Sequence, residues 1–227
     1  MTARKSNERE LRRAQRSLFG RGSRVASFLG RVAAFRVPRP YGGFRWIAAA
    51  ALLLFLIQMA TGVLLSLYYY PDPGTAYSST RFIAGDVPIG WLIRSVHHWA
   101  GEFLLIAVTL QLVTFYFRRA FLRPRQYEWV LSVLMLMTVL MLRFTGRMLP
   151  WDTVGYEVTR GGLELLKSVP ILGSFTANWL KGGEEFGPNT LSRFFTTHVL
   201  ILPWIVVTFT AIHIYLVLRH DKPEEDS

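Results

Sequence analysis

The chain has 227 residues, of which 51% are hydrophobic, and its mean hydropathy of +0.27 is typical of a small membrane bundle rather than a soluble domain. Its formal net charge is +11, but its Arg residues flank apolar runs, so we expect an anchor in the membrane and no nucleic acid among the partners. The absence of cysteine excludes disulfide bonds and metal clusters held by cysteine on this chain.

The first 43 residues are rich in positive charge. Twelve Arg or Lys residues lie between Arg4 and Arg45. Apolar residues recur there at roughly helical spacing between positions 12 and 35, which predicts an amphipathic helix on the membrane surface. We therefore expect residues 1–43 to form a basic cytoplasmic arm that binds anionic lipid headgroups.

Four apolar stretches follow, at about 44–70, 91–117, 129–148 and 191–218. Each is long enough to cross a bilayer, which takes roughly 20 residues. Four Arg residues lie between the second and third stretches: Arg118, Arg119, Arg123 and Arg125. Under the positive-inside rule this loop and the N-terminal arm are cytoplasmic, so both termini are cytoplasmic.

The sequence thus predicts an all-α membrane protein, a bundle of four transmembrane helices over residues 44–219 with a cytoplasmic tail at 220–227. On the outer side, residues 150–190 contain short amphipathic pieces at about 161–169 and 175–180. Pro203 is expected to kink the fourth helix.

Histidines near the outer ends of two spans are candidate metal ligands. His97 lies about six residues inside the second span, and His198 lies at a similar depth in the fourth. Ionisable residues inside a membrane are costly and usually functional, although a structural role for one buried histidine is the alternative. Two imidazoles from facing helices are what a six-coordinate haem iron needs. The spacing does not choose between His97 and His98, because helix neighbours point about 100° apart.

A second site is predicted nearer the inner face. His213 follows His198 by fifteen residues, which is about 22 Å along a helix and about 60° around it. Its partner on the second span falls at Gln111, and Gln is a weak iron ligand. A second haem held by His213 with Gln111 is therefore only a tentative prediction.

Small residues complete this arrangement. Gly62 in the first span and Gly146 in the third lie at the level of the outer histidines, where Gly lets a flat macrocycle approach the backbone. Close packing of the helices is the alternative explanation. Fourteen residues earlier, at the inner level, stand Ala48 and Ser132.

Several motifs in order carry a family resemblance: QMATG at 58–62, YYYPDPGTAY at 68–77, GWLIRSVHHW at 90–99, GRMLPWDTVGY at 146–156 and TLSRFFTTHVLILP at 190–203. With them, residues 44–219 resemble the cytochrome b family in its short four-helix form. This form is the cytochrome b6-like N-terminal half of bc- and b6f-type complexes. The fifteen-residue histidine interval is similar to this short form.

The resemblance implies a haem b whose iron is held by His97 and His198, with Arg94 paired to a propionate. It also implies that residues 150–152 form one wall of an outer quinol-oxidation pocket. Candidate residues of that pocket are Asp152, Glu157 and Arg147, for each of which a structural or solvated role is the alternative.

The function implied is that of a cytochrome subunit in a quinol:electron-acceptor oxidoreductase of a bacterial-type inner membrane. Expected partners are quinone, lipid, a Rieske-type iron–sulfur protein or c-type cytochrome, and a separate subunit that supplies the C-terminal half, in an oligomeric complex. The alternatives are a single-haem or haem-poor membrane anchor that links the quinone pool to another periplasmic redox partner, and a structural scaffold.

Departures from the family pattern cluster at the inner site. The family has His in place of Gln111 and Gly in place of Ala48 and Ser132. We therefore expect the inner haem to be absent, tilted or held by His213 alone. Trp46 stands where b6f-type chains have a Cys that binds an extra haem, so that haem is not expected.

Two charges inside the spans are unusual. Glu102 lies in the second span and Arg143 in the third. Charges within a membrane usually pair or line a path. We expect these two to interact with each other, with a haem propionate or with a partner chain.

Overall fold

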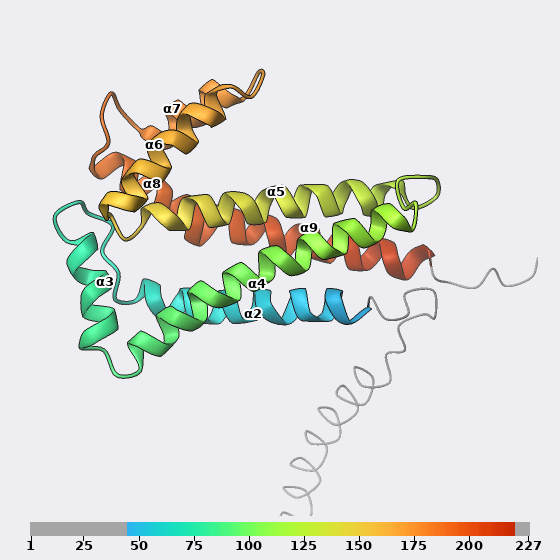
Figure 1. The fold of residues 1–227 in the computed structure, drawn as a ribbon, viewed down its shortest axis with the longest axis horizontal. Coiled ribbons are helices and arrows are strands. Elements are labelled where there is room, and N and C mark those ends of the chain that lie inside the picture. Colours follow the sequence, from blue (N-terminus) through green and yellow to red (C-terminus); the bar gives the residue numbers. More distant parts are fainter. Residues whose placement is uncertain (1–44, 221–227) are drawn as a thin grey trace, which may run out of the picture. The chain divides into compact units, whose positions relative to one another are not determined.

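The computed structural model describes residues 45–220, which form helices joined by short connections (Figure 1). In chain order these are α2 (Arg45–Ser66), α3 (Ala76–Gly85), α4 (Gly90–Phe117), α5 (Gln126–Met148), α6 (Thr153–Lys167), α7 (Gly173–Lys181), α8 (Pro188–Thr196), the π-helical turn η2 (Thr197–Ile201) and α9 (Leu202–His220). The predicted arm at 1–43, with its amphipathic helix, and most of the predicted tail lie outside the described residues.

The prediction of four spans is confirmed in this part of the chain. Four helical segments are long and apolar enough to cross a membrane: Trp46–Ser66, Gly90–Phe117, Gln126–Met148 and Pro188–Val217. The last of these runs without a break through α8, η2 and α9. Which side of the membrane the termini occupy remains a prediction.

The spans pack around an apolar core at mid-bundle. Helix α4 lies against α2 and α5, and α5 also lies against α9. The buried core residues come from all four of these helices: Ala51, Phe55, Leu104, Ala107, Val108, Val139 and Val206. Most other apolar side chains on the spans are exposed, as expected of surfaces that face lipid.

The short helices gather at one end of the bundle, where α6, α7 and α8 pack in sequence and α3 packs against α4 (Figure 1). A second apolar cluster joins α5, α6, α7 and α8 there through Met148, Leu163, Ala177, Leu180 and Phe194. Most of the predicted piece at 161–169 lies in the second half of a longer helix, α6. That helix begins earlier than predicted, at Thr153, where Asp152 caps it by accepting a hydrogen bond from Gly155 N at 2.6 Å. Helix α3 was not predicted.

The first span is shorter than predicted. Helix α2 ends at Ser66 instead of about residue 70. Beyond it, the Tyr69 hydroxyl donates to the Leu149 carbonyl at 2.6 Å, and its ring stacks on Phe195 at 5.5 Å between centroids. Burial raises the pKa of the Tyr69 phenol, so this hydroxyl stays protonated as a donor. Tyr69 thus connects the segment after the first span to the end of the third span and the start of the fourth.

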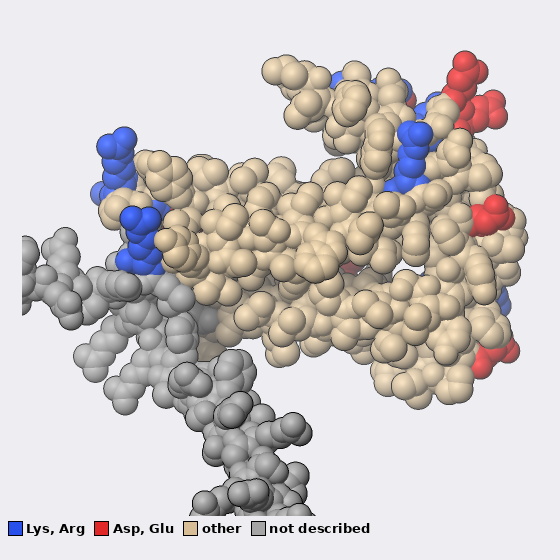
Figure 2. All heavy atoms as spheres, turned by 180° about the vertical axis from the view of Figure 1, so that it is seen from behind, with Lys and Arg blue, Asp and Glu red and all other residues tan. Residues whose placement is uncertain are grey.

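Charge separates along the bundle. On the face in Figure 2, a broad band without Lys, Arg, Asp or Glu covers the middle of the spans. Basic side chains lie at one end, where residues 118–125 connect α4 to α5, and both signs occur at the end with the short helices. This pattern is what the positive-inside rule requires if residues 118–125 are cytoplasmic.

Candidate haem site

His97 is held by a threonine of the neighbouring span. Its Nδ1 lies 2.9 Å from Thr61 Oγ1, and that hydroxyl donates to the Ile57 carbonyl at 2.6 Å. Because the hydroxyl proton is used there, the oxygen is free to accept the N–H at Nδ1, which leaves Nε2 as the unprotonated nitrogen. Gly62 lies directly against the ring, since a Cβ there would be 3.3 Å from His97 Cε1.

His198 repeats this arrangement on the other pair of helices. Its Nδ1 lies 3.1 Å from Thr145 Oγ1, and that hydroxyl donates to the Met141 carbonyl at 2.8 Å. A Cβ on Gly146 would be 2.7 Å from His198 Cε1, so any larger residue at this position would force the ring to move. Each imidazole therefore has one ring nitrogen fixed by threonine and one glycine beneath it.

The two rings are spaced as ligands of one metal would be. Their centroids are 6.3 Å apart and their planes make an angle of 71°. With about 2 Å for each metal–nitrogen bond and about 1 Å from each nitrogen to its ring centre, two imidazoles on opposite sides of one metal have centres about 6 Å apart. The residues present therefore fit a bis-imidazole iron, and the glycines leave room for the two imidazole rings against the neighbouring helices.

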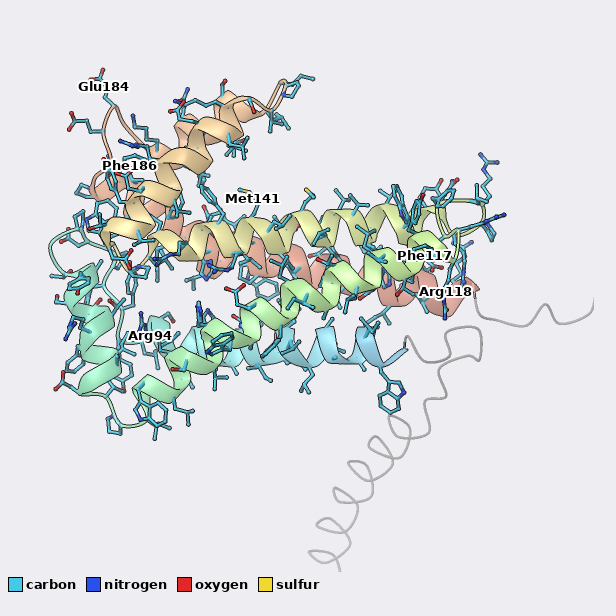
Figure 3. All side chains as sticks on the ribbon, in the orientation of Figure 1. Arg94, Phe117, Arg118, Met141, Glu184 and Phe186 are labelled. Carbon is cyan, nitrogen blue, oxygen red and sulfur yellow. The ribbon has the colours of Figure 1, made fainter. Side chains whose placement is uncertain are left out.

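The adjacent histidine is placed differently. His98 is exposed, and its nearest ring contact is the edge of Trp99 at 5.6 Å. Arg94, one turn before His97, lies near the α3 end of α4 (Figure 3). It is exposed and forms no hydrogen bond or ion pair with the described residues. Its guanidinium thus remains available to an anionic group.

The threonines that orient the two histidines were not singled out in the sequence. A signal for them exists, since a Thr directly precedes each site glycine, at 61–62 and at 145–146. A further unpredicted contact fixes the α4 backbone, where Gln58 Nε2 donates to the His97 carbonyl at 2.5 Å. Together these polar contacts hold one ring nitrogen of each imidazole and the backbone of His97.

The inner site has another construction. Gln111 Nε2 and His213 Nε2 are 3.5 Å apart and both residues are buried, so the structure brings this predicted pair together. The Phe115 ring stacks on His213 with centroids 5.5 Å apart and planes at 22°. His213 Nδ1 is buried and has no hydrogen-bond partner in the part of the chain that the structure describes.

Neighbouring residues at this level differ in burial. Ser132 is buried, and its hydroxyl donates to the Glu128 carbonyl at 2.9 Å. The Glu128 side chain is fully buried, with Arg125 Nε 3.8 Å away. Ala48 and Trp46 are exposed. A buried carboxylate near His213 was not anticipated from the sequence.

The predicted quinol-pocket residues are not brought into one group. Arg147 Nη1 and Asp152 Oδ2 form an ion pair at 3.4 Å at the start of α6. Glu157 instead pairs with Arg160 at 2.8 Å, and both of these side chains are largely exposed. Inside the spans, Arg143 Nη2 and Glu102 Oε1 are 2.5 Å apart, so these two charges interact with each other as expected.

Comparison with known proteins identifies relatives of this chain. Residues 41–221 match the family model described as Cytochrome b/b6/petB. The chain is 37% identical over 183 residues to cytochrome b6 of Prochlorococcus marinus (strain MIT 9303), and 38% identical over 183 residues to cytochrome b6 of Synechococcus sp. (strain RCC307). Each match covers 81% of this chain and 84% of the relative.

A solved structure shares the fold. A chain of "Hyperthermophilic respiratory Complex III" superposes with a TM-score of 0.77 at 25% identity, over 93% of this chain and 59% of that one. The chain therefore spans about three fifths of the length of that solved protein. From the family match and the identity to the relatives together, the chain belongs to the cytochrome b/b6 family, in its b6-like four-helix form.

Proposed function

We propose that the chain is the b-type cytochrome subunit of a membrane quinol-oxidising complex and that His97 and His198 hold its haem b. Haem b is the cofactor that membership of the family implies. The observation that carries this assignment is the paired imidazole arrangement, with ring centroids 6.3 Å apart and each Nδ1 held by a threonine. Such outer contacts fix the tautomer and orientation of metal-binding histidines.

The protein's own contribution is to bind, orient and bury this group. Bound haem supplies one-electron transfer, while the protein sets its position and surroundings. The hydroxyls of Thr61 and Thr145 hold both Nε2 atoms in the metal-binding form, and Gly62 and Gly146 leave room for the two imidazole rings. Arg94 supplies a cation to a propionate, for which charge-assisted hydrogen bonds are the natural partner.

The quinol pocket and the partners extend this proposal. Quinol binds on the side of the membrane that carries α6, next to Arg147, Asp152 and Glu157. A Rieske-type iron–sulfur protein or c-type cytochrome would accept one electron of the quinol, and a haem held by His97 and His198 would supply the one-electron chemistry for the other. In this proposal a separate subunit of the same complex supplies the C-terminal half of the cytochrome. The complex lies in a bacterial-type inner membrane with both termini of this chain cytoplasmic.

The α-band absorbance of the purified complex tests the outer site. Replacing either ligand, in H97L or H198L, should abolish the low-spin bis-imidazole spectrum of this haem. H98Q is the matched control, because His98 is the adjacent histidine and is exposed, and it should keep the spectrum unchanged. Loss of the band in H98Q with retention in H97L would overturn the assignment.

The inner site is altered in this proposal and does not hold a bis-imidazole haem. The support is chemical: its second ligand position is Gln111, Phe115 covers one face of His213, and His213 Nδ1 lacks the threonine partner found at the outer site. A haem count by the pyridine haemochrome method should therefore give one haem b per chain. A count of two would refute this part of the proposal and leave the outer site intact.

A gain-of-function variant sharpens this test. Q111H combined with A48G and S132G restores the imidazole and the two glycines that the family carries at these positions. The triple variant should bind a second haem, and Q111H alone should bind less of it, because Cβ atoms at 48 and 132 still crowd the ring. A triple variant that still holds one haem would mean that another feature, such as buried Glu128, excludes the second.

The altered inner site favours one alternative function. If electrons cannot cross the membrane by a second haem, the chain serves as a single-haem anchor that links the quinone pool to another periplasmic redox partner. Isolation of the native complex separates the two functions. An iron–sulfur protein that copurifies with a C-terminal cytochrome subunit favours the quinol-oxidising complex, whereas copurification of a different redox protein favours the anchor.

A further inference from the structure

An ion pair joins two spans beneath the outer haem site. Arg143 Nη2 on α5 lies 2.5 Å from Glu102 Oε1 on α4, with side chains 40% and 28% exposed. Both residues lie inside predicted membrane spans. Burying an ion pair away from water seldom adds stability over apolar residues, so stability alone gives little reason for the pair.

The Glu102 end of the pair is linked to the His97 side of the site. Glu102 follows Gly101, which lies against Gln58, since a Cβ on Gly101 would be 3.4 Å from Gln58 Nε2. The same Nε2 donates to the His97 carbonyl. At 1.5 Å per residue, Glu102 is about 7.5 Å further along α4 than His97, toward the middle of the span.

The Arg143 end is linked to the His198 side. Arg143 precedes Thr145, which holds His198 Nδ1, by two residues, and precedes Gly146 by three. It therefore lies about 4.5 Å from Gly146 along α5, again toward the middle of the span. Each charge is thus carried on a helix that supports one of the two ligands, within two turns of the site.

A charge pair at this position acts on the redox equilibrium of the site. Reducing a haem iron adds one negative charge, and in a medium of low dielectric constant nearby charges affect that step strongly. A cation stabilises the reduced form and an anion destabilises it. We propose that Arg143 raises the reduction potential of the haem held by His97 and His198, and that Glu102 limits this rise and fixes the guanidinium in place.

This inference rests on the proposed function of the outer site and deepens it. A purely structural clamp between α4 and α5 makes a different prediction. It would lower stability in both single variants and leave the potential unchanged, or shift it in the same direction in both. Opposite shifts are expected only if the charges act on the redox step.

A potentiometric titration of the α-band in the purified complex tests the proposal. E102Q leaves an uncompensated cation and should raise the potential, while R143Q leaves an uncompensated anion and should lower it. Each shift should change the ratio of reduced to oxidised haem severalfold at a fixed potential, where a tenfold change corresponds to about 59 mV for one electron. The double variant E102Q/R143Q should lie between the two.

The exposed pair on α6 provides matched controls. Lys167 Nζ lies 2.7 Å from Glu164 Oε1, and Lys167 lowers the pKa of the Glu164 carboxyl. E164Q and K167Q remove the same charges from a surface outside the spans, where water and salt screen them. They should leave the potential at the wild-type value.

The outcomes separate this inference from the proposed function. A wild-type complex without a haem spectrum defeats the proposed function. A normal spectrum whose potential is unmoved, or moved in the same direction, in E102Q and R143Q overturns the tuning role. If a neutral variant does not retain haem, E102D and R143K decide instead: both keep their charge and should keep the wild-type potential, and a clear shift in either would show that packing sets it.

Discussion

The histidines of the two levels differ in what holds their second ring nitrogen. At the outer level Thr61 and Thr145 accept from Nδ1, whereas His213 Nδ1 is buried without a partner among the described residues. Because contacts of this kind orient metal-binding imidazoles, we expect the outer site to bind iron more readily than the inner one. The outer site differs from the inner one by two threonine hydroxyls. Each donates its proton to the carbonyl four residues earlier on its own helix, which leaves its oxygen free to accept the histidine N–H.

Removing either hydroxyl should weaken haem binding without removing a ligand. T61V or T145V keeps the side-chain shape but loses the acceptor for Nδ1–H, and loss of such partners typically costs about 10–100-fold in metal affinity. Haem retained per chain after incubation with excess apomyoglobin measures the effect. T138V is the control, since the Thr138 hydroxyl likewise donates to the carbonyl four residues earlier but touches no histidine. Equal loss in T138V would contradict a specific role.

The site glycines should tolerate alanine unequally. In G146A the new Cβ would be 2.7 Å from His198 Cε1, which forces the ring to move, whereas in G62A the closest approach to His97 is 3.3 Å. Overpacking of this kind costs about 1–3 kcal/mol. We expect G146A to lose most of its haem and G62A to lose less, measured as the haem-to-protein ratio. G161A, with open space around its Cβ, should retain all of it; equal retention in G146A would mean that the ring is not fixed.

At the level of helices, the fourth span contains a feature that sequence periodicity could not supply. Pro203 predicts a kink, and the structure has the π turn η2 just before it, at Thr197–Ile201. Regular α-helical geometry places His213 about 60° around from His198. A π turn has more residues per turn, so it reduces that rotation and brings the two histidines closer to one face. A proline signals an irregularity, but its form depends on packing.

Replacing Pro203 should disturb the outer site through this turn. P203A restores a backbone N–H and removes the steric clash with the preceding turn, which favours a regular α helix through 197–203. Straightening the turn would rotate His198 away from Thr145, so we expect the haem content of P203A to fall severalfold. P170A, in the connection between α6 and α7, is the control and should keep the wild-type haem content. Unchanged haem content in P203A would show that packing alone maintains the π turn.

For the whole molecule, hydropathy and motif order predicted the four spans and the pairing of His97 with His198 in space. The spans follow from long apolar runs, and helical depth places a histidine of the second span level with His198, but the choice of His97 over His98 came from the family resemblance. The capping of α6 by Asp152, the tie from Tyr69 to Leu149 and the burial of Glu128 could not be predicted, because each depends on contacts between distant segments. The side of the membrane that each end faces rests on charge alone and is therefore still a prediction.

Because the chain has no cysteine, single introduced cysteines can report this orientation cleanly. S174C lies on exposed α7, and L122C lies in the exposed basic connection between α4 and α5. If the basic residues are cytoplasmic, a membrane-impermeant maleimide should label S174C on intact cells and L122C only after permeabilisation. L56C, on an exposed face of the first span, should stay unlabelled in both, because lipid covers it. Labelling of L122C on intact cells would invert the topology and place the haem of His97 and His198 at the cytoplasmic face.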